Sequence, residues 1–489
     1  MKPAPALLFA LALIGLTALR LAIAAVVPIS PDEAYYWVWS QAPAWSYYDH
    51  PFMVALWARI GTFLLGPTPL GIRLLGPLSA ALASVLIVDA ARSLSAGRGY
   101  AAALLLNASL VFGVGSVLMT PDTPLLFFWI ATLWAMARLI AGGSGWWWIV
   151  AGGAAGLAFD SKYTAALLLA GIGLWFLSLP AGRRWLKDWR PWAGLALALI
   201  LFLPIILWNA DHGWVSFAKQ GGRTENFHPA RAVQFLGELI GGQAGLATPI
   251  IFILCVAGLA RESLLALRAR DAAAGLLVAL GVLPALVFLQ HALGARVQGN
   301  WPEIIYPAGV IAAARLPACR AWLKPGAALG FAMTLLVYIQ AVASPLPLGG
   351  ARDPTVRLLG GWQTLADDAA IQAAAAHASF IAVDDYGLAS EMVLHLPASL
   401  PVLGAGPRWH YFALPHPETF APPGTTGLFL RTTRRQGPPA AASWSRIAPL
   451  GQIERKRGSR LAETYDVYAV TVGPAGPALL TRLPTGAAP

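Results

Sequence analysis

Long apolar runs separated by short polar loops dominate the first 345 residues. Runs of this length suit helices that cross a bilayer, since about 20 apolar residues span its hydrocarbon core. The pattern predicts eleven transmembrane helices, at 5–27, 70–90, 100–120, 122–140, 146–160, 162–180, 191–209, 245–260, 273–292, 303–315 and 326–344.

The pattern changes after Ala343. Residues 346–489 carry scattered charges, many prolines and short alternating or apolar runs such as "SFIAVDDYG", "GLFLRT" and "YDVYAV". Short runs of this kind, bounded by turn residues, are typical of strands in a small α/β soluble domain. We therefore predict two domains, a membrane domain over 1–345 and a soluble domain over 346–489.

Composition supports a polytopic α-helical membrane protein. The chain of 489 residues is 57% hydrophobic and 12% charged, whereas a soluble domain carries about 25% charged residues. The net charge of +11 would suggest nucleic acid in a soluble protein. Here contact with anionic lipid and control of topology explain it more simply, so we expect membrane lipids and no nucleic acid as partners.

The N-terminal run resembles a signal peptide in having Lys2 before a stretch that is apolar up to Val27. Its length allows it to span the membrane, and further spans follow. We therefore expect it to be kept as the first helix.

Basic residues predict the topology. Cytoplasmic loops are enriched in Lys and Arg. With the N-terminus inside, the inside segments hold fourteen basic residues, about twice as many as the outside loops of the membrane part. Eleven spans then place the soluble domain outside. These fourteen are Lys2, Arg92, Arg98, Arg138, Arg183, Arg184, Lys187, Arg190, Arg261, Arg268, Arg270, Arg315, Arg320 and Lys324.

The unusual polar clusters of the membrane part all fall on the predicted outer side. This one-sidedness predicts a polar cavity at the outer membrane surface. The clusters are Asp32–Glu33 and Asp49–His50 in the first loop, Asp122, Asp160 to Lys162, the loop 210–243, and 295–303.

The adjacent acids Asp32 and Glu33 lie among three Trp and four Tyr in "PISPDEAYYWVWSQAPAWSYYDHPFMVAL". One carboxylate can act as a general base or can orient a substrate, and the aromatic rings can stack on a sugar. The alternative is an interfacial helix with charged residues and a belt of aromatic side chains.

Asp122 and Lys162 flank apolar helices. Asp122 can cap a helix or complement its dipole. A charge such as Lys162 deep in the bilayer costs about 2.5–3.5 kcal/mol, so it indicates a partner, a cavity or a side chain that reaches the interface. Asp160 is one candidate partner. Arg223 in "KQGGR" is a weaker candidate for binding phosphate.

Several motifs together resemble the bacterial family 39 glycosyltransferases, relatives of protein O-mannosyltransferases and of the lipid A aminoarabinose transferase. The resemblance implies a GT-C fold and a polyprenyl-phosphate-linked sugar donor. It also implies an acceptor outside the cytoplasmic membrane. The motifs are "PDEAYYWVWSQ", "YYDHPFMVALWARIGT", "MTPDTPLLFFW", "FDSKYTA", "FAKQGGR", "FLGELIGGQ" and "RVQGNWPEIIYPAG".

The resemblance also assigns residues. It implies that Asp32 is the catalytic carboxylate, that Asp122 is the second acidic position, and that Lys162, Arg223 or Arg296 contacts the donor phosphate. The chain departs from the family pattern at Phe52, Asp160 and Glu303. The remaining motif residues expected to bind substrate are Glu33, Tyr35, Tyr48, Asp49, His50, Tyr163, Asn300 and Trp301.

We therefore predict an enzyme of the bacterial inner membrane that transfers a sugar from a polyprenyl-phosphate donor. The acceptor is lipid A or LPS, another envelope glycan, or a protein on the periplasmic side, and the anomeric configuration inverts. The sequence requires no cofactor, and a divalent metal that bridges Asp32, Asp122 or a nearby His stays open. The alternatives are a transporter or flippase of polyprenyl-linked sugars and a non-enzymatic lipid-binding scaffold.

Overall fold

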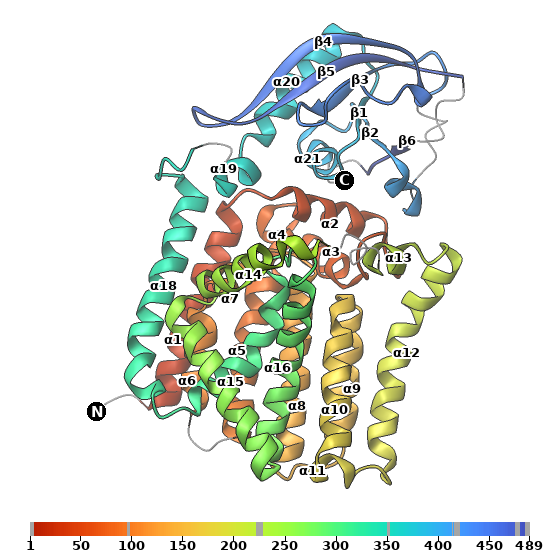
Figure 1. Cartoon of the computed structure of the whole chain (residues 1–489). Coiled ribbons are helices and arrows are strands. Elements are labelled where there is room, and N and C mark those ends of the chain that lie inside the picture. Colours follow the sequence, from red (N-terminus) through yellow and green to blue (C-terminus); the bar gives the residue numbers. More distant parts are fainter. Residues whose placement is uncertain are drawn as a thin grey trace. The chain divides into compact units, whose positions relative to one another are not determined.

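The structure is a computed structural model that describes residues 4–94, 98–221, 228–349, 353–412, 414, 421–474 and 480–484 (Figure 1). The chain divides into two compact units. The helical unit consists of Met1–Ala22, Asp49–Val54 and Leu74–Tyr338. The mixed unit consists of Ile23–Tyr48, Ala55–Arg73 and Ile339–Pro489.

The helical unit is a bundle of apolar helices, and helices cover most of each of the eleven predicted segments, although 100–120 and 245–260 are interrupted. Helix α8 packs on α5 and α9, α9 packs on α12, and α15 packs on α16 and α17. The helices are α1 (Pro5–Val26), α5 (Leu75–Leu94), α6 (Gly99–Ala108), α7 (Leu110–Gly115), α8 (Asp122–Ile140), α9 (Trp147–Phe159), α10 (Ala166–Ser178), α11 (Pro180–Arg183), α12 (Trp189–Asp211), α13 (Val215–Gly221), α14 (Ala232–Leu246), α15 (Pro249–Ala269), α16 (Ala272–Ala292), α17 (Tyr306–Ala314) and α18 (Cys319–Ala343), with the 3-10 turns η1 (Tyr163–Ala165), η3 (Pro229–Arg231) and η4 (Trp301–Ile305).

Seven helices among the described residues are long and apolar enough to cross a membrane. The other predicted spans form shorter helices, so the count of eleven crossings stays a prediction. The seven are Pro5–Val26, Pro69–Leu94, Asp122–Ile140, Trp189–Asp211, Pro249–Ala269, Ala272–Ala292 and Cys319–Ala343.

Small residues bring neighbouring helices into close contact, as is common in membrane bundles. A Cβ atom added at Gly152 of α9 would lie 2.0 Å from the carbonyl oxygen of Gly194 in α12. A Cβ atom added at Gly330 of α18 would lie 1.9 Å from the carbonyl oxygen of Ala108 in α6. At both places the backbones themselves touch, so even alanine would push the helices apart.

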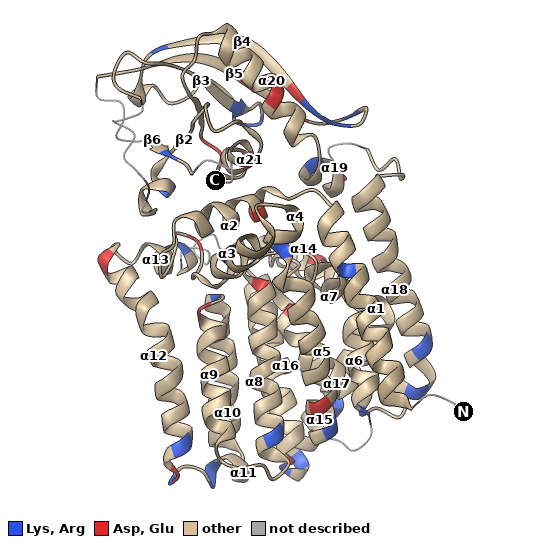
Figure 2. Cartoon of the chain, turned by 180° about the vertical axis from the view of Figure 1, so that it is seen from behind, with Lys and Arg blue, Asp and Glu red and all other residues tan. Residues whose placement is uncertain are grey.

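Lys and Arg gather at one end of the bundle, where α8 ends and α12 begins (Figure 2). Arg138 lies in the last turn of α8, and Arg190 lies in the first turn of α12. Asp122 begins α8 and therefore lies at the opposite end. The bundle thus places Asp122 at the end away from these basic loops.

The mixed unit contains a six-stranded sheet in the order β4-β5-β3-β1-β2-β6. Strand β1 pairs parallel with β2 and β3, and the remaining pairs are antiparallel. The predicted α/β character of the C-terminal region is confirmed. The strands are β1 (Ile381–Val383), β2 (Val402–Ala405), β3 (Thr426–Thr432), β4 (Trp444–Arg457), β5 (Arg460–Val472) and β6 (Leu480–Arg482), and the helices are α2 (Pro31–Gln41), α3 (Met53–Leu65), α4 (Pro69–Arg73), α19 (Pro354–Leu359), α20 (Trp362–Ala375) and α21 (Tyr386–His395), with the 3-10 turns η6 (Pro407–Tyr411) and η8 (Ala441–Ser443).

The mixed unit also includes two segments from the predicted membrane region, 23–48 and 55–73. Helix α2 packs against α21 of the C-terminal region, although more than 300 residues separate them in the chain. That the membrane domain ends at residue 345 stays a prediction. The mixed unit, by contrast, combines these two early segments with the C-terminal region.

A buried ion pair fixes the first loop of this unit. Ser30 and Glu33 form a capping box at the start of α2, in which the Ser30 backbone N–H donates to Glu33 Oε2 at 3.1 Å and the Ser30 side chain accepts from the Glu33 N–H. The Ser30 hydroxyl also lies 2.9 Å from Glu33 Oε2. Arg73 donates to both oxygens of Glu33 at 2.6 Å. Its guanidinium also donates to the carbonyls of Ala24, Val27 and Pro28. Arg73 therefore ties the end of α1 to the start of α2.

We predict that Arg73→Ala destabilises the folded protein. The change leaves the Glu33 carboxylate buried without its charge partner, and breaking a buried pair in this way costs about 3–5 kcal/mol. The melting temperature in detergent should fall well below that of the wild type. Arg320→Ala, at an exposed position, is the control. Equal melting temperatures for the two variants would contradict a structural role for the pair.

A second buried carboxyl group lies on α21. Glu391 is fully buried, and His395 Nε2 lies 3.4 Å from its Oε2. The pKa of Glu391 is raised from 4.5 to about 7, mainly by burial and in small part by Glu33, although His395 and Arg455 oppose the shift. The folded chain therefore holds this proton more tightly than the unfolded chain does.

We predict that Glu391 makes stability depend on pH. A carboxyl group whose pKa is raised by folding favours the folded state at low pH, and this contribution falls as the pH rises from 4.5 to about 7. The full effect is on the order of 3 kcal/mol. Glu391→Gln should flatten the fall in melting temperature between pH 5 and pH 8. Exposed Glu454→Gln should keep the wild-type dependence of melting temperature on pH. An unchanged dependence in Glu391→Gln would exclude Glu391 as its cause.

Candidate active site

A buried cluster of three polar side chains lies at the end of the bundle opposite the basic loops. Asp122 begins α8, and Lys162 follows α9, the next helix, which runs back toward the same end. Lys162 Nζ lies 2.5 Å from Asp122 Oδ1, and Asn300 Nδ2 donates to Asp122 Oδ2 at 2.7 Å. Lys162 and Asp122 are each 5% exposed, so the charge of the lysine is compensated inside the protein.

Asp122 is thus the partner that Lys162 was expected to need, and Asp160, the other candidate, has a different environment. The Asp160 carbonyl accepts from the Met53 N–H at 2.9 Å. Its side chain is buried, and Oδ1 has no hydrogen-bond partner among the described residues. The backbone of Asp160 therefore supports the turn that carries Lys162.

Glu303 is a second buried acid near Asp122. Both residues line a small cavity of about 30 Å³ that also borders Ser79 and Ser116. Glu303 Oε1 has no hydrogen-bond partner among the described residues. An unmatched buried oxygen of this kind is costly unless the group is protonated or a ligand binds it.

Lys162 also lines a larger cavity of about 300 Å³. An ammonium group, imidazoles, an amide and a phenol next to apolar walls form a suitable surface for an anion attached to a hydrophobic chain. The other polar and aromatic residues of this lining are His50, Tyr163, Thr164, Gln220, Phe288, His291 and Trp301.

Hydrogen bonds hold the walls of this cavity. The Tyr163 hydroxyl lies 2.7 Å from Ser216 Oγ, which donates to Asn209 Oδ1 at 2.5 Å. Gln220 Nε2 donates to the Asp49 carbonyl at 2.6 Å. The structure therefore brings together seven of the predicted residues, namely Asp49, His50, Asp122, Lys162, Tyr163, Asn300 and Trp301.

The other two basic candidates do not join this cluster. Arg296 forms an exposed ion pair with Glu238, with nitrogen–oxygen distances of 2.7 and 2.9 Å. The hydrogen bonds from Arg296 lower the pKa of Glu238. Arg223 lies outside the described residues. The geometry thus favours Lys162 among the three candidates for the donor phosphate.

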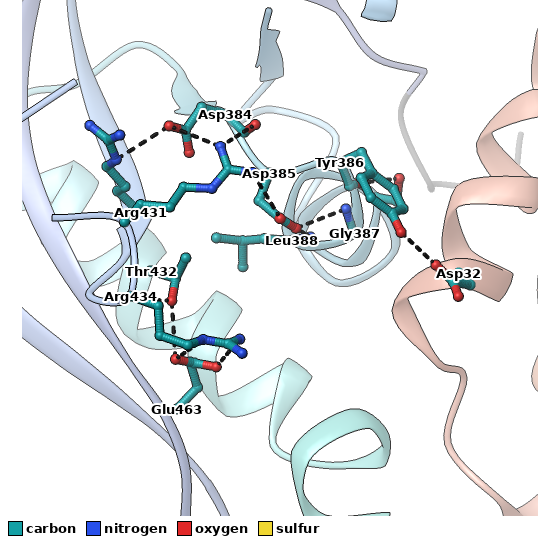
Figure 3. Close-up of polar contacts among 12 residues, drawn as sticks. Asp32, Asp384, Asp385, Tyr386, Gly387, Leu388, Arg431, Thr432, Arg434 and Glu463 are labelled. Atoms are coloured by element: carbon teal, nitrogen blue, oxygen red, sulfur yellow. Dashed lines mark hydrogen bonds and ion pairs between the residues drawn. The ribbon is translucent and has the colours of Figure 1, made fainter. Parts of the chain in front are cut away.

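Four predicted residues of the first loop lie in the mixed unit, namely Asp32, Glu33, Tyr35 and Tyr48, whereas Asp49 and His50 belong to the helical unit. Asp32 accepts a hydrogen bond from the Tyr386 hydroxyl at 2.9 Å (Figure 3) and lines a polar cavity of about 410 Å³ within that unit. Tyr35 packs on Tyr386 with ring centroids 4.7 Å apart, and Tyr48 stacks on Tyr411 at 5.4 Å. Glu33 faces Arg73 instead, which favours a positioning role over direct contact with substrate.

Four neighbours of the predicted residues were not identified from the sequence. Arg73 and His291 are lone polar residues at the ends of apolar segments, and Gln220 belongs to the "KQGGR" motif, so each left a weak signal. Tyr386 left no signal, because only the folded chain brings it to Asp32. Among the described residues, no three His, Cys, Asp or Glu side chains form a group that could hold a metal, and the divalent ion stays a prediction.

Comparisons with known proteins agree with this architecture. The family model described as "Dolichyl-phosphate-mannose-protein mannosyltransferase" matches residues 49–208. The chain is 29% identical to the lipid A galacturonosyltransferase RgtD of Rhizobium johnstonii over 286 residues, which is 58% of this chain. The match spans 59% of the length of that relative.

Solved structures extend the likeness to nearly the whole chain. The crystal structure of ArnT from Cupriavidus metallidurans bound to undecaprenyl phosphate superposes with a TM-score of 0.63 at 15% identity, covering 96% of this chain and 99% of ArnT. The apo form gives 0.61 at 16% identity, covering 95% and 98%. The predicted resemblance to the family 39 glycosyltransferases is therefore confirmed, and the chain has the GT-C fold.

Proposed function

We propose that the protein is a membrane glycosyltransferase that moves a sugar from a polyprenyl-phosphate donor to an acceptor outside the cytoplasmic membrane. The observation that carries the proposal is the buried Lys162–Asp122–Asn300 cluster at the edge of the 300 Å³ cavity. The names of the similar proteins, a lipid A galacturonosyltransferase and an ArnT bound to undecaprenyl phosphate, support it.

Lys162 binds the donor phosphate in this proposal. Its ammonium group has three N–H donors, and the bond to Asp122 uses one of them. The others can bind phosphate oxygens, with His50 and His291 in the same cavity lining. A fixed cation stabilises the charge that develops when the phosphate leaves the anomeric carbon. Asp122 and Asn300 keep the lysine in place for this task.

The reaction itself is a displacement at the anomeric carbon. A bond forms between the acceptor oxygen and that carbon, and the bond to the phosphate oxygen breaks, so polyprenyl phosphate leaves with the electron pair. Attack from the opposite face inverts the configuration. Asp32 takes the proton of an acceptor hydroxyl or orients it. An acceptor phosphate needs no base, and Asp32 would then only orient it.

The acceptor we favour is lipid A or a related envelope lipid, because the relative RgtD acts on lipid A by its name. We place the enzyme in the inner membrane with the site on the periplasmic side, so that the basic end of the bundle faces the cytoplasm. A divalent ion is an optional addition to this scheme. A transporter or flippase is less favoured, since the similar proteins are transferases by name.

We predict that Lys162→Met weakens donor binding about tenfold or more, which is the loss expected for a charge-assisted hydrogen bond. Binding of a polyprenyl phosphate to purified protein in detergent measures the effect. Arg296→Met is the matched control, because that arginine is exposed and paired with Glu238.

Loss of the lysine also leaves Asp122 buried without a charge partner, so a second variant is needed. The double variant Asp122→Asn, Lys162→Met restores neutrality and should fold, yet it should still bind the donor weakly. Wild-type donor binding by a folded double variant would rule out Lys162 as the phosphate ligand.

We predict that Asp32→Asn lowers single-turnover transfer to a hydroxyl acceptor about 10²–10⁴-fold, because general-base help has this magnitude. Asn keeps the shape of Asp but takes up no proton at neutral pH, and folding should be preserved. Glu33→Gln should mainly lower the melting temperature and should cost much less turnover per folded molecule. Wild-type turnover of Asp32→Asn would make Asp122 the next candidate.

A further inference from the structure

Tyr386 in the C-terminal region contacts the predicted catalytic carboxylate. Its hydroxyl donates to Asp32 Oδ1 at 2.9 Å, and 354 positions separate the two residues in sequence (Figure 3). Both belong to the mixed unit. Asp32 is exposed and lines the 410 Å³ cavity, so a molecule in the cavity can reach its carboxylate.

The backbone of Tyr386 is held by a network at the start of α21. Asp385 caps this helix, and its side chain accepts from the N–H groups of Gly387 and Leu388, both at 3.0 Å. Arg435 pairs with Asp384 and Asp385 at 3.3 and 3.4 Å. The capped first turn of α21 is therefore linked to the sheet, because Arg435 lies three residues beyond the end of β3.

The ring of Tyr386 is held from other sides. It packs on Tyr35 of α2, and the Arg408 guanidinium lies 4.1 Å from its centroid. A Cβ atom added at Gly387 would lie 2.7 Å from the Pro31 Cβ, so the first turns of α2 and α21 are in close contact. Burial, and then the nearby Asp32 carboxylate, raises the pKa of Tyr386, which keeps the phenol protonated as a donor.

We infer that Tyr386 is a positioning residue for Asp32, so that the C-terminal region supplies part of the catalytic machinery. The inference rests on the proposed function. One oxygen of Asp32 accepts from Tyr386, and this directs the other oxygen to the acceptor hydroxyl. A hydrogen bond to the ionised carboxylate also favours its charged form, which is the form that takes up a proton.

Other charged groups surround this pair and bear on its pH dependence. Arg434 and Glu463 form an ion pair at the cavity wall, and Arg455 is buried with its donors on backbone carbonyls and on the Tyr465 hydroxyl. The charged groups that line the cavity besides Asp32 are Arg357, Asp385, Arg434, Arg455 and Glu463, and Arg408 lies over the Tyr386 ring.

The test is Tyr386→Phe, which keeps the ring, its packing and the contact with Arg408 but removes the hydroxyl. We expect turnover from a polyprenyl-phosphate sugar to fall about three- to tenfold, as for loss of one hydrogen bond, with an unchanged KM for the donor. The acidic limb of the pH–rate profile should move to higher pH. Tyr468→Phe removes a hydroxyl from β5 of the same unit and is the control. It should leave the turnover and the pH–rate profile unchanged.

A double variant separates positioning from stability. In the Asp32→Asn background, Tyr386→Phe should cause no further loss, because the two residues act as one unit. Equal turnover and pH profile for wild type and Tyr386→Phe, or an added loss in the double variant, would overturn the inference. A wild-type protein that transfers no sugar would instead overturn the proposed function, and the positioning role with it.

Discussion

A lysine inside a membrane protein keeps its charge only where a carboxylate and further hydrogen bonds compensate it, and this constraint organises the helical unit. Lys162 meets Asp122 at 2.5 Å, and Asn300 fixes the other oxygen of the acid. The three side chains come from the start of α8, the end of α9 and the turn before α17, so the pair determines how three parts of the bundle meet. The partners that burial of the lysine requires also hold its ammonium group in a fixed position beside a cavity.

The two adjacent acids of the first loop show how helix geometry divides tasks. Successive residues on a helix point about 100° apart, so Asp32 and Glu33 cannot face the same environment. Glu33 turns inward to Ser30 and Arg73 and joins the ends of α1 and α2. Asp32 stays exposed to a cavity and meets Tyr386. Buried Glu33 thus fixes the backbone that carries exposed Asp32.

Much of the fold could be predicted because it follows from local patterns. Apolar runs predicted the helices, and the change of pattern after Ala343 predicted the α/β region. Lone charges in apolar surroundings pointed to Asp122 and Lys162, since such charges need partners. Pairings over long sequence distances could not be predicted, because Arg73, Tyr386 and Arg408 become relevant only when separate segments meet. The assignment of 23–48 and 55–73 to the mixed unit has the same cause.

The glycine contact between α9 and α12 has a mechanical consequence. Gly152 and Gly194 lie near the basic ends of two helices that run side by side, and their backbones touch there. From the glycines, α9 continues for about 10 Å to its end before Lys162, and α12 continues for about 22 Å to Asn209, which accepts from Ser216 next to Tyr163. A residue larger than glycine at this contact would push α9 and α12 apart, and these helices lead to Lys162 and to Asn209, which supports Tyr163 through Ser216. The spacing of the two helices therefore bears on the cavity wall at a distance from the residues that line it.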